Sequence, residues 1–362
     1  MKIAVGMSGG VDSSVAAHLL LKAGHDVSGV LMKIWPGPDA PAGARSACYG
    51  PDEAEDVEAA RDVCARLAIP LSIVDCAGSY EEIVLRDFRE KYLAGTTPNP
   101  CIRCNERIKF RVFLQRARRL GADYIATGHH ARVARGSAGS RYLLKKGKDT
   151  AKDQSYFLFR LTQAQLARVL MPVGDLTKAE VRTIARRLGL SVAEKAESQE
   201  TCFAPLGDYP KFLTGRAPRA FRPGSILDLE GNVLGEHKGI GNYTIGQRRG
   251  LGISAPRPLY VAAIDPRRNA VIVGEEKALY QKKLQGSAVH LIAGGRIEEP
   301  VIVKAKIRYK HQEARALVVP VSARRVGVEF DRPQRAITPG QSVVFYRRDV
   351  VVGGGIIDRS LD

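Results

Sequence analysis

Residues 6–14 read Gly6-Met7-Ser8-Gly9-Gly10-Val11-Asp12-Ser13-Ser14, and they join a short apolar run at 2–6 to a helical pattern at 11–21. Glycines let backbone amides approach an anion closely, serine hydroxyls add hydrogen-bond donors, and the start of a helix adds a favourable dipole. The stretch is therefore predicted to be a strand-to-helix turn that binds a phosphate group. The alternative is a glycine-rich turn that binds no ligand.

Strand and helix patterns alternate through the first 130 residues. Short β-rich runs are found at 2–6, 27–34, 71–74 and 124–127. Helical spacing of apolar residues is found at 11–21, 53–68, 80–92 and 105–120. Strands separated by single helices predict parallel pairing through right-handed crossovers, so this region is expected to be a doubly wound α/β sheet.

The pattern changes further along the chain. Helices are expected at 162–170 and 177–188, the second with a capping box from Thr177 to Glu180 and a stop at Gly189. From about residue 221, short Val/Ile-rich runs are broken by Gly, Pro and Asp, as in small β domains or barrels. These runs lie at 259–264, 270–273, 301–309, 325–330 and 342–346. We expect an α/β domain at 1–205, a small β-rich domain at 206–281 and a β-barrel-like domain at 282–362.

The chain is strongly basic. Its 362 residues include 56 Lys and Arg against 38 Asp and Glu, a formal charge of +18. Such a field attracts polyanions, and phosphate contacts by Lys and Arg gain affinity through counterion release, so a nucleic acid is the expected partner rather than a merely solvated surface. No apolar run approaches the roughly 20 residues of a membrane span, and the first residues do not resemble a secretory leader. A cytoplasmic location is therefore expected.

Six cysteines are present, and in a large cytoplasmic chain cysteines are more often buried, reactive or metal-bound than disulfide-linked. Cys64 and Cys76 fall at apolar positions of a helix and a strand end, where a core role is expected. Cys101 and Cys104 lie in a turn-rich stretch, Thr97-Pro98-Asn99-Pro100-Cys101-Ile102-Arg103-Cys104-Asn105. Cys202 lies far along the chain in a polar stretch.

Cys104 falls near the start of the helix expected at 105–120, beside Arg103 and Arg107. A helix N-terminus and cationic neighbours both favour the thiolate, which is the reactive form of cysteine. A reactive pair of Cys104 with Cys202 is therefore the favoured interpretation. The alternatives are purely structural cysteines, a zinc site that lacks an evident fourth ligand, and an iron–sulfur cluster on Cys101, Cys104 and Cys202.

The loop at 8–14 is not a Walker A sequence, because no Gly-Lys-Ser/Thr follows, and it is not a GxGxxG dinucleotide loop. It resembles the SGGxDS pyrophosphate loop of the PP-loop ATPases, which split ATP between the α and β phosphates and adenylate a carbonyl oxygen. By that resemblance, Asp12 would help to hold Mg²⁺. Met32 and Gly128 end the second and fourth strands, where ligands of open α/β sheets bind, so both are expected to border the adenine or ribose.

Further segments extend the resemblance to one family. The chain is similar nearly end to end to the tRNA-specific 2-thiouridylases (the MnmA/TrmU family), which make 2-thiouridine at the wobble position of some tRNAs. The similar segments are SGGVDSS at 8–14, TPNPCIRCNERIKF at 97–110, ATGHHAR at 126–132, KDQSYFLFRL at 152–161, ESQETCF at 197–203 and YTIGQRRGLGI at 243–253. Several such segments in the family's order are far more specific than any one of them.

The resemblance implies a role for each matching residue. ATP would be bound by Gly6, Met7, Ser8, Gly9, Gly10, Val11, Asp12, Ser13, Met32 and Gly128. The target base would be lined by Asn99, Pro100 and Cys101. The tRNA would be contacted by His129, Lys152, Asp153, Gln154, Arg308, Tyr309 and Gln341. ATP would adenylate O2 of the uracil, Cys202 would carry a persulfide delivered by a sulfur-relay partner protein, and Cys104 would be its partner thiol. A monomer bound to one tRNA is the default expectation for the assembly.

Cys101 departs from the family pattern, since many members have Asp at that position. The change removes a carboxylate that could handle a proton, and it keeps the iron–sulfur alternative open. Two other functions are alternatives: a PP-loop ligase that adenylates a small-molecule carboxylate or amide, and a nucleotide-sensing RNA-binding protein without turnover. The seven basic residues at 101–120, against the single acid Glu106, favour an RNA partner.

Overall fold

The computed structural model describes residues 1–35, 53–136, 141–195, 202–203, 209–214 and 221–361. Among these, the N-terminal strands form one parallel sheet in the order β3-β2-β1-β4-β7. Their bounds are β1 (Lys2–Met7), β2 (Asp26–Lys33), β3 (Leu71–Asp75), β4 (Tyr124–Ala126) and β7 (Val169–Leu170). Ile3 and Val5 of β1 belong to one apolar cluster and Ala4 belongs to another, so this central strand is buried on both faces. The predicted α/β fold is confirmed.

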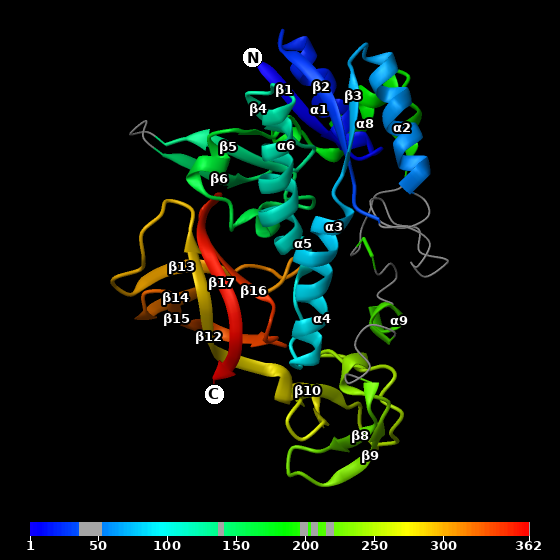
Figure 1. Ribbon diagram of the computed structural model, residues 1–362. Helices are drawn as coiled ribbons and strands as arrows, with labels where there is room; N and C mark the ends of the chain where they lie inside the picture. The colour runs from blue at the N-terminus through cyan, green and yellow to red at the C-terminus, as the bar shows by residue number, and fades with distance from the viewer. Residues whose placement is uncertain (36–52, 137–140, 196–201, 204–208, 215–220, 362) are drawn as a thin grey trace.

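Helices cover both faces of this sheet (Figure 1). One face carries α1 (Val11–Lys22), α2 (Glu53–Arg66) and α8 (Lys178–Arg187), whose apolar side chains join those of Ile3 and Val5. The other face carries α6 (Phe113–Arg119), whose Phe113 and Ala117 pack in the cluster that contains Ala4. This two-sided cover is what an uninterrupted apolar strand requires.

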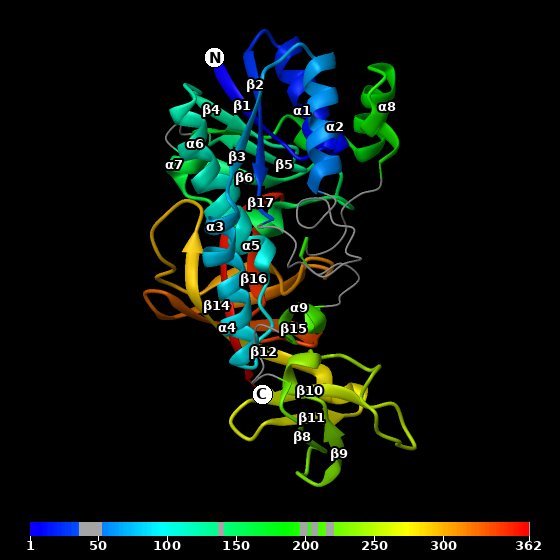
Figure 2. The same cartoon turned by 45° about the vertical axis from the view of Figure 1, so that its right-hand side comes forward.

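Two long helices pass through turns with π-type hydrogen bonding. The first consists of α3 (Ala77–Tyr80), η1 (Glu81–Leu85) and α4 (Arg86–Leu93), and it corresponds to the helix predicted at 80–92. The second consists of α5 (Pro100–Cys104), η2 (Asn105–Val112) and α6. Figures 1 and 2 show both helices descending from the sheet toward the C-terminal units.

The second helix begins at Pro100 rather than at residue 105, where the sequence pattern placed it. Asn99 caps the helix, because its side-chain oxygen accepts a hydrogen bond from the backbone N of Ile102 at 3.3 Å. Proline suits the first helical position, which needs no N–H donor. Cys101 and Cys104 therefore lie inside the first helical turns and not in a loop before them.

The helix predicted at 162–170 is only partly present. Thr162 caps the short helix α7 (Gln163–Leu166), but Val169 and Leu170 then form β7 beside β4. Pairing with the parallel sheet replaces further helical turns there. The helix predicted at 177–188 is confirmed as α8, including the capping box between Thr177 and Glu180.

Two β units follow. The smaller has the order β10-β11-β8-β9, with bounds β8 (Gly224–Leu227), β9 (Val233–His237), β10 (Tyr260–Asp265) and β11 (Ala270–Gly274). The larger has the order β12-β15-β14-β13-β16-β17, and pairing of β12 with β17 closes it into a barrel. Its bounds are β12 (Tyr280–Leu291), β13 (Val301–Lys306), β14 (Ala314–Ser322), β15 (Arg325–Arg335), β16 (Ser342–Arg347) and β17 (Val350–Leu361). The β-rich runs predicted after residue 221 are confirmed.

A hairpin that the sequence pattern did not indicate links the two halves. It consists of β5 (Ala131–Arg135) and β6 (Tyr142–Lys146), and Lys145 pairs with Val350 of β17. The shorter helical elements are η3 (Ser155–Leu158), η4 (Pro172–Asp175), η5 (Ser191–Glu194), α9 (Tyr209–Thr214), η8 (Ile240–Asn242) and η9 (Glu276–Leu279). Within the described residues, every helix is too short or too polar to cross a membrane.

Candidate active site

The glycine-rich loop joins β1 to α1 as predicted, and its shape depends on Gly9. This residue has φ +65°, and a Cβ there would lie 2.7 Å from the carbonyl oxygen of Asp56 on α2. The hydroxyls of Ser13 and Ser14 donate to the carbonyl oxygen of Gly10 at 3.0 and 2.9 Å. The loop is therefore a fixed turn at the N-terminus of a helix, which is the geometry that binds phosphate.

Gly128 follows β4 and lies directly against this loop. A Cβ at Gly128 would come within 2.6 Å of the backbone N of Ser13, so only glycine fits without displacing the loop. Met32 lies near the end of β2 and packs against two apolar clusters. The structure thus places both residues at the carboxyl edge of the sheet, as the topology argument predicted.

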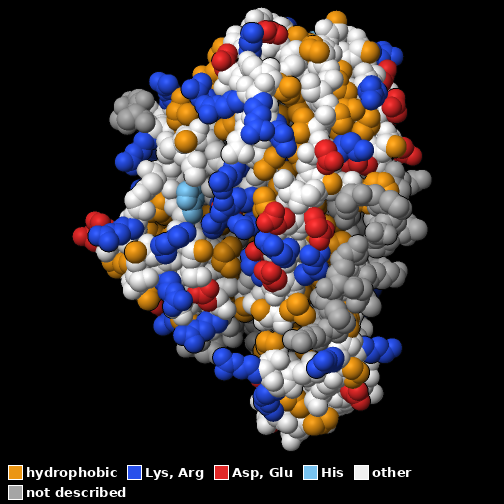
Figure 3. Space-filling view, in the orientation of Figure 1, with side chains coloured by type: hydrophobic (Ala, Val, Ile, Leu, Met, Phe, Trp, Pro, Cys, Tyr) orange, Lys and Arg blue, Asp and Glu red, His pale blue; other side chains and the backbone are white. Residues whose placement is uncertain are grey.

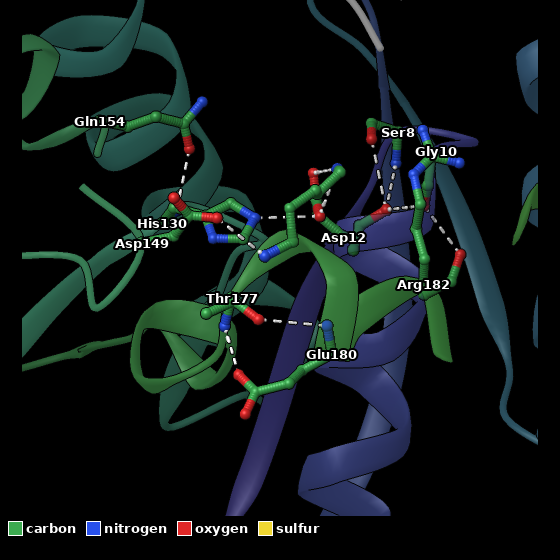
Figure 4. A network of polar contacts seen from close by, with 12 residues as sticks. Ser8, Gly10, Asp12, His130, Asp149, Gln154, Thr177, Glu180 and Arg182 are labelled. Atoms are coloured by element: carbon green, nitrogen blue, oxygen red, sulfur yellow. Dashed lines mark hydrogen bonds and ion pairs between the residues drawn. The ribbon is translucent and has the colours of Figure 1, made fainter. Parts of the chain in front are cut away.

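Asp12 is the charged centre of the loop. Lys178 Nζ lies 2.7 Å from each Asp12 carboxylate oxygen, and His130 Nε2 lies 3.1 Å from Oδ1. Burial alone would raise the pKa of Asp12, but the hydrogen bonds from His130 and Lys178 outweigh it and hold that pKa below its usual value. Figure 4 shows Asp12 facing His130 across the carboxyl edge of the sheet. The carboxylate is therefore ionised and firmly held.

Sequence reasoning missed Lys178 and His130 as parts of this site. Lys178 is the first residue of α8, where the Thr177 cap fixes the backbone and Asp149 Oδ2 accepts from the Lys178 backbone N at 3.0 Å. Its side chain is only 11% exposed. The capping box was visible in the sequence, but nothing local indicated that the residue after it reaches a loop 166 positions earlier.

The second half of the site is a group of three cysteines around Tyr80. Tyr80 Oη lies 3.0 Å from Cys202 Sγ. Burial, together with the neighbouring Cys202, Cys104 and Cys101, raises the pKa of Tyr80 well above its usual value. Cys104 and Cys202 also pack in the same apolar cluster as Tyr80. The structure therefore brings together the cysteines that the sequence singled out, and it adds Tyr80, which sequence reasoning missed.

The electrostatics of this group differ in part from expectation. Burial, with a smaller effect of Cys101, raises the pKa of Cys202 to about 11, while the hydrogen bond from Tyr80 and the charge of Lys109 act to lower it. Arg103 and Arg107, expected to act on Cys104, lie 3.6 and 3.3 Å from the carboxylate of Glu106. Glu106 also accepts from Arg160 Nε at 2.9 Å. Glu106 thus pairs with three arginines, and its single negative charge offsets only part of the positive charge beside the cysteines.

Several residues predicted to contact tRNA are engaged inside the fold. His129 is buried, its Nδ1 lies 2.8 Å from Thr127 Oγ1, and burial lowers its pKa to about 3. The Asp153 carboxylate is buried and accepts from the backbone N of Gly147 and Ser155. Gln154 Oε1 accepts from the backbone N of His130 at 2.9 Å. His129 and Gln154 therefore brace the connection between β4 and β5, whereas Asp153 holds the residues after β6 and the start of η3. Lys152 adjoins Asp153 in sequence.

The barrel reaches the cysteine site through Gln341. Its side-chain amide donates to the carbonyl oxygens of Thr97 and Pro98 at 2.9 and 3.3 Å. Arg308 donates to the carbonyl oxygen of Arg335 at 3.0 Å, and the ring of Tyr309 stacks on Phe157 with a centroid separation of 4.4 Å. Gln341 thus holds the segment that leads into Asn99, Pro100 and Cys101.

A band of Lys and Arg side chains runs over α6 and downward toward the barrel (Figure 3). Four of the seven basic residues at 101–120 are exposed, namely Arg111, Arg116, Arg118 and Arg119. Arg103, Arg107 and Lys109 are half-buried. The exposed members supply a positive surface along η2 and α6, while the basic residues nearest to Cys104 in sequence are the half-buried ones.

These features define a class of protein: a HUP-type domain with a phosphate-binding loop and a cysteine group, followed by two β units. Residues 1–205 match the family described as tRNA methyl transferase HUP domain, residues 210–275 the tRNA methyl transferase PRC-barrel domain, and residues 281–357 the aminomethyltransferase beta-barrel domain. The tRNA-specific 2-thiouridylase MnmA of Acetivibrio thermocellus is 47% identical over 98% of this chain and 99% of its own length. That of Moorella thermoacetica is 49% identical over 98% of each. The chain belongs to the tRNA-specific 2-thiouridylase (MnmA) family.

Proposed function

We propose that this protein uses ATP to replace the C2 oxygen of the wobble uridine of tRNA by sulfur. The observation that supports it best is the pairing of a phosphate-binding loop, built around Asp12, with a group of three cysteines around Tyr80, in a chain of this family. A ligase that acts on a small molecule would need the loop but not the cysteines. An RNA-binding protein without turnover would need neither a reactive thiol pair nor the buried charges at Asp12.

The first step is adenylation. The loop amides and the α1 N-terminus bind the phosphates of ATP, and Met32 and Gly128 border the nucleoside. The uracil O2 attacks the α-phosphorus, and pyrophosphate leaves. Asp12 suits one Mg²⁺, because Mg²⁺ in nucleotide sites is usually held by one or two carboxylates together with the substrate's phosphates. Lys178, which neutralises Asp12 in this structure, supplies a second positive charge beside the departing anion.

The second step is sulfur transfer. Cys202 receives its outer sulfur from a persulfide-bearing partner protein. That sulfur attacks C2, AMP leaves with the C–O bonding pair, and the Cys104 thiolate attacks Cys202 Sγ to release 2-thiouridine and form a Cys104–Cys202 disulfide. The alternative order, in which Cys104 first frees the sulfur as sulfide, gives the same products. A dithiol reductant then reopens the disulfide.

An iron–sulfur cluster has cysteine ligands of the right type in Cys101, Cys104 and Cys202. Across the described residues, however, no three His, Cys, Asp or Glu side chains are placed to hold a metal ion. We therefore assign no step to a cluster. Cys101 lines the target base with Asn99 and Pro100 in the proposed complex, at the start of α5.

The tRNA lies over the band of basic side chains and the barrel in this proposal. His129, Lys152, Asp153 and Gln154 form its inner border, and Arg308, Tyr309 and Gln341 its barrel side. Because His129, Asp153 and Gln154 have internal hydrogen bonds, they act mainly by shaping the surface that meets the RNA. The enzyme acts as a cytoplasmic monomer on one tRNA, with domains at 1–205, 206–281 and 282–362.

The test is nucleoside mass spectrometry of unmodified tRNA incubated with enzyme, ATP, Mg²⁺ and a persulfide source. Wild type should form 2-thiouridine, and Cys104→Ser and Cys202→Ser should not, while iron is assayed in the same samples. Bulk tRNA should also stimulate release of AMP and pyrophosphate. If wild type forms no 2-thiouridine even after anaerobic purification with iron restored, the proposal fails and the small-molecule ligase takes its place.

A further inference from the structure

Tyr80 occupies an unusual position for a tyrosine. It is the last residue of α3, its side chain is buried, and its hydroxyl ends at a cysteine sulfur, 3.0 Å from Cys202 Sγ. A Phe would fill the same apolar space, so the hydroxyl is the part of the side chain that the core does not need. Burying that polar group is costly unless it forms a hydrogen bond, and Cys202 supplies a partner.

The direction of this hydrogen bond follows from the surroundings. Burial and the neighbouring thiols raise the pKa of Tyr80 well above its ordinary value, so the phenol keeps its proton at physiological pH. When Cys202 is ionised, as it must be to act as a nucleophile, only the phenol has a proton to donate, so the hydrogen bond then runs from Tyr80 Oη to Cys202 Sγ. The same hydrogen bond acts to lower the pKa of Cys202, against the effect of burial.

Cys202 is anchored on its other side by the next residue. The ring of Phe203 is buried and packs against Phe88 and Phe212, each with a centroid separation of 4.8 Å. Phe203 thus fixes the backbone at this point, and Tyr80 fixes the neighbouring sulfur. Two independent contacts therefore hold Cys202 in the apolar cluster that also contains Cys104.

We propose that Tyr80 is a positioning residue for sulfur transfer, whose hydroxyl donates a hydrogen bond to Cys202 Sγ and holds that atom for each reaction in which it takes part. This inference rests on the proposed function. In loading, the Cys202 thiolate attacks the outer sulfur of the donor persulfide, an S–S bond forms, and the donor thiolate leaves with the electron pair of the broken bond. In release, Cys104 attacks the same Sγ, and the electron pair of the broken S–S bond passes to the sulfur on C2.

Both reactions require three sulfur atoms in line: Cys202 Sγ is the entering atom in loading and the central, attacked atom in release. A fixed position for Sγ therefore lowers the entropy that each reaction must lose. Adenylation occurs at the PP-loop and does not involve Sγ. The hydroxyl of Tyr80 should therefore matter for sulfur transfer and not for the formation of pyrophosphate.

The test is Tyr80→Phe, which keeps the ring and deletes only the hydroxyl. Loading of Cys202 from an inorganic polysulfide, followed by peptide mass spectrometry, should slow about tenfold, the size of one lost hydrogen bond to a charged group. Single-turnover formation of 2-thiouridine should fall by a similar factor. Release of pyrophosphate with tRNA should stay within about twofold of wild type.

Tyr92→Phe is the matched control. Tyr92 is buried in the same cluster, and its ring packs on that of Tyr209 with a centroid separation of 5.0 Å. The side chains that act on the pKa of its hydroxyl are Tyr209 and Thr244. This variant should load and transfer sulfur like wild type.

Equal losses of pyrophosphate release and sulfur transfer in Tyr80→Phe would show a packing role and overturn the inference. The inference would also be overturned if Tyr80→Phe loaded Cys202 at the wild-type rate. Loading of Cys202 is measured on the protein without tRNA. Slower loading of Cys202 in Tyr80→Phe than in wild type would support the inference even if wild type formed no 2-thiouridine. The test of the inference is therefore separable from the test of the proposed function.

Discussion

At the scale of single residues, the contact between Lys178 and Asp12 combines stability with function. Lys178 Nζ lies 2.7 Å from both carboxylate oxygens, and the lysine is largely buried whereas Asp12 is 30% exposed. Removing one partner of such a pair leaves a partly buried charge without compensation. The exposure of Asp12 keeps the penalty below that of a fully buried pair.

Lys178→Met is expected to lower the free energy of unfolding by about 1–3 kcal/mol, because the Asp12 carboxylate then relies on His130. Adding Asp12→Asn removes the stranded charge and should recover most of that stability. In both Lys178→Met and the double variant, tRNA-dependent release of pyrophosphate should be at least about tenfold slower than in wild type. Urea denaturation and a pyrophosphate assay measure the two quantities.

Lys148→Met is the control for this charge change. Lys148 lies at the exposed end of the same polar network, where it pairs with Glu180 at 3.0 Å. Its loss should change neither stability nor pyrophosphate release appreciably. A defect in Lys148→Met as large as that in Lys178→Met would mean that general positive charge, and not the contact at Asp12, is required.

His129 makes stability depend on pH. Its pKa falls from 6.5 to about 3 on folding, mainly through burial and with a smaller effect of Lys109 and His130, opposed by Asp12. Below pH 6.5 the unfolded chain binds a proton that the folded chain excludes, so stability falls as the pH falls toward 3. Between pH 7 and 4.5 this residue should account for a loss of about 2–3 kcal/mol.

The measurement is the free energy of unfolding of wild type and His129→Asn at both pH values. Asparagine cannot take up a proton, so the variant should lose about 2–3 kcal/mol less than wild type over this range. Parallel pH profiles for the two proteins would contradict the assignment.

At the scale of elements, the start of α8 shows how a local signal sets a distant site. Thr177 and Glu180 form a capping box that fixes the first turn of α8, and the side chain of Lys178 extends from that turn to Asp12. Thr177→Ala should cost about 1 kcal/mol in unfolding free energy. Because the first turn then frays, the KM for ATP should also rise.

Thr162→Ala tests whether that second effect is specific. Thr162 forms a similar capping box with Gln165 at α7, and its loss should cost a comparable amount of stability. It should leave the KM for ATP unchanged, since α7 packs against β6 and β7, neither of which contains a residue of the PP-loop. A rise in KM in both variants would indicate a general effect of lower stability.

Much of the fold could be predicted from sequence because its signals are local. The apolar run of β1, the glycines and serines after it, and the cap of α8 each act within a few residues, and all were confirmed. The errors are also local in cause. Asn99 and Pro100 read as a turn when they are in fact a cap and a first helical position, and Val169 and Leu170 left the helical pattern because β4 pairs with them.

At the scale of the whole molecule, local sequence patterns were insufficient to predict which distant segments meet. The pairing of β6 with β17 and the approach of Tyr80 to Cys202 join segments more than 100 positions apart, and the contact of Gln341 with Thr97 spans 244. Only the tertiary fold decides which side chains meet over such spans. The cysteines were identified from sequence by their chemistry, but Tyr80 and Lys178 had no local pattern to mark them.

The barrel holds the segment before α5 through a close backbone contact as well as through Gln341. The backbone N of Thr97 donates to the carbonyl oxygen of Pro339 at 2.9 Å, and Gly340 lies against Thr97. Gly340 has φ +90°, and a Cβ there would lie 2.9 Å from both the N and the O of Thr97. A side chain at 340 must therefore push the segment that positions Cys101 and Cys104.

Gly340→Ala should consequently impair sulfur transfer beyond its effect on stability, with 2-thiouridine formation at least about tenfold lower under conditions where the variant is folded. Gly294→Ala separates the two effects. Gly294 also has a positive φ, +76°, but a Cβ there meets nothing within 4 Å, so only the backbone strain of about 1–2 kcal/mol applies. Circular dichroism melting and single-turnover thiolation of both variants give the comparison. Equal activity after correction for the folded fraction would show that the barrel does not position the cysteine-bearing helix, whereas a loss confined to Gly340→Ala would show that the C-terminal unit aligns the chemistry on the N-terminal one.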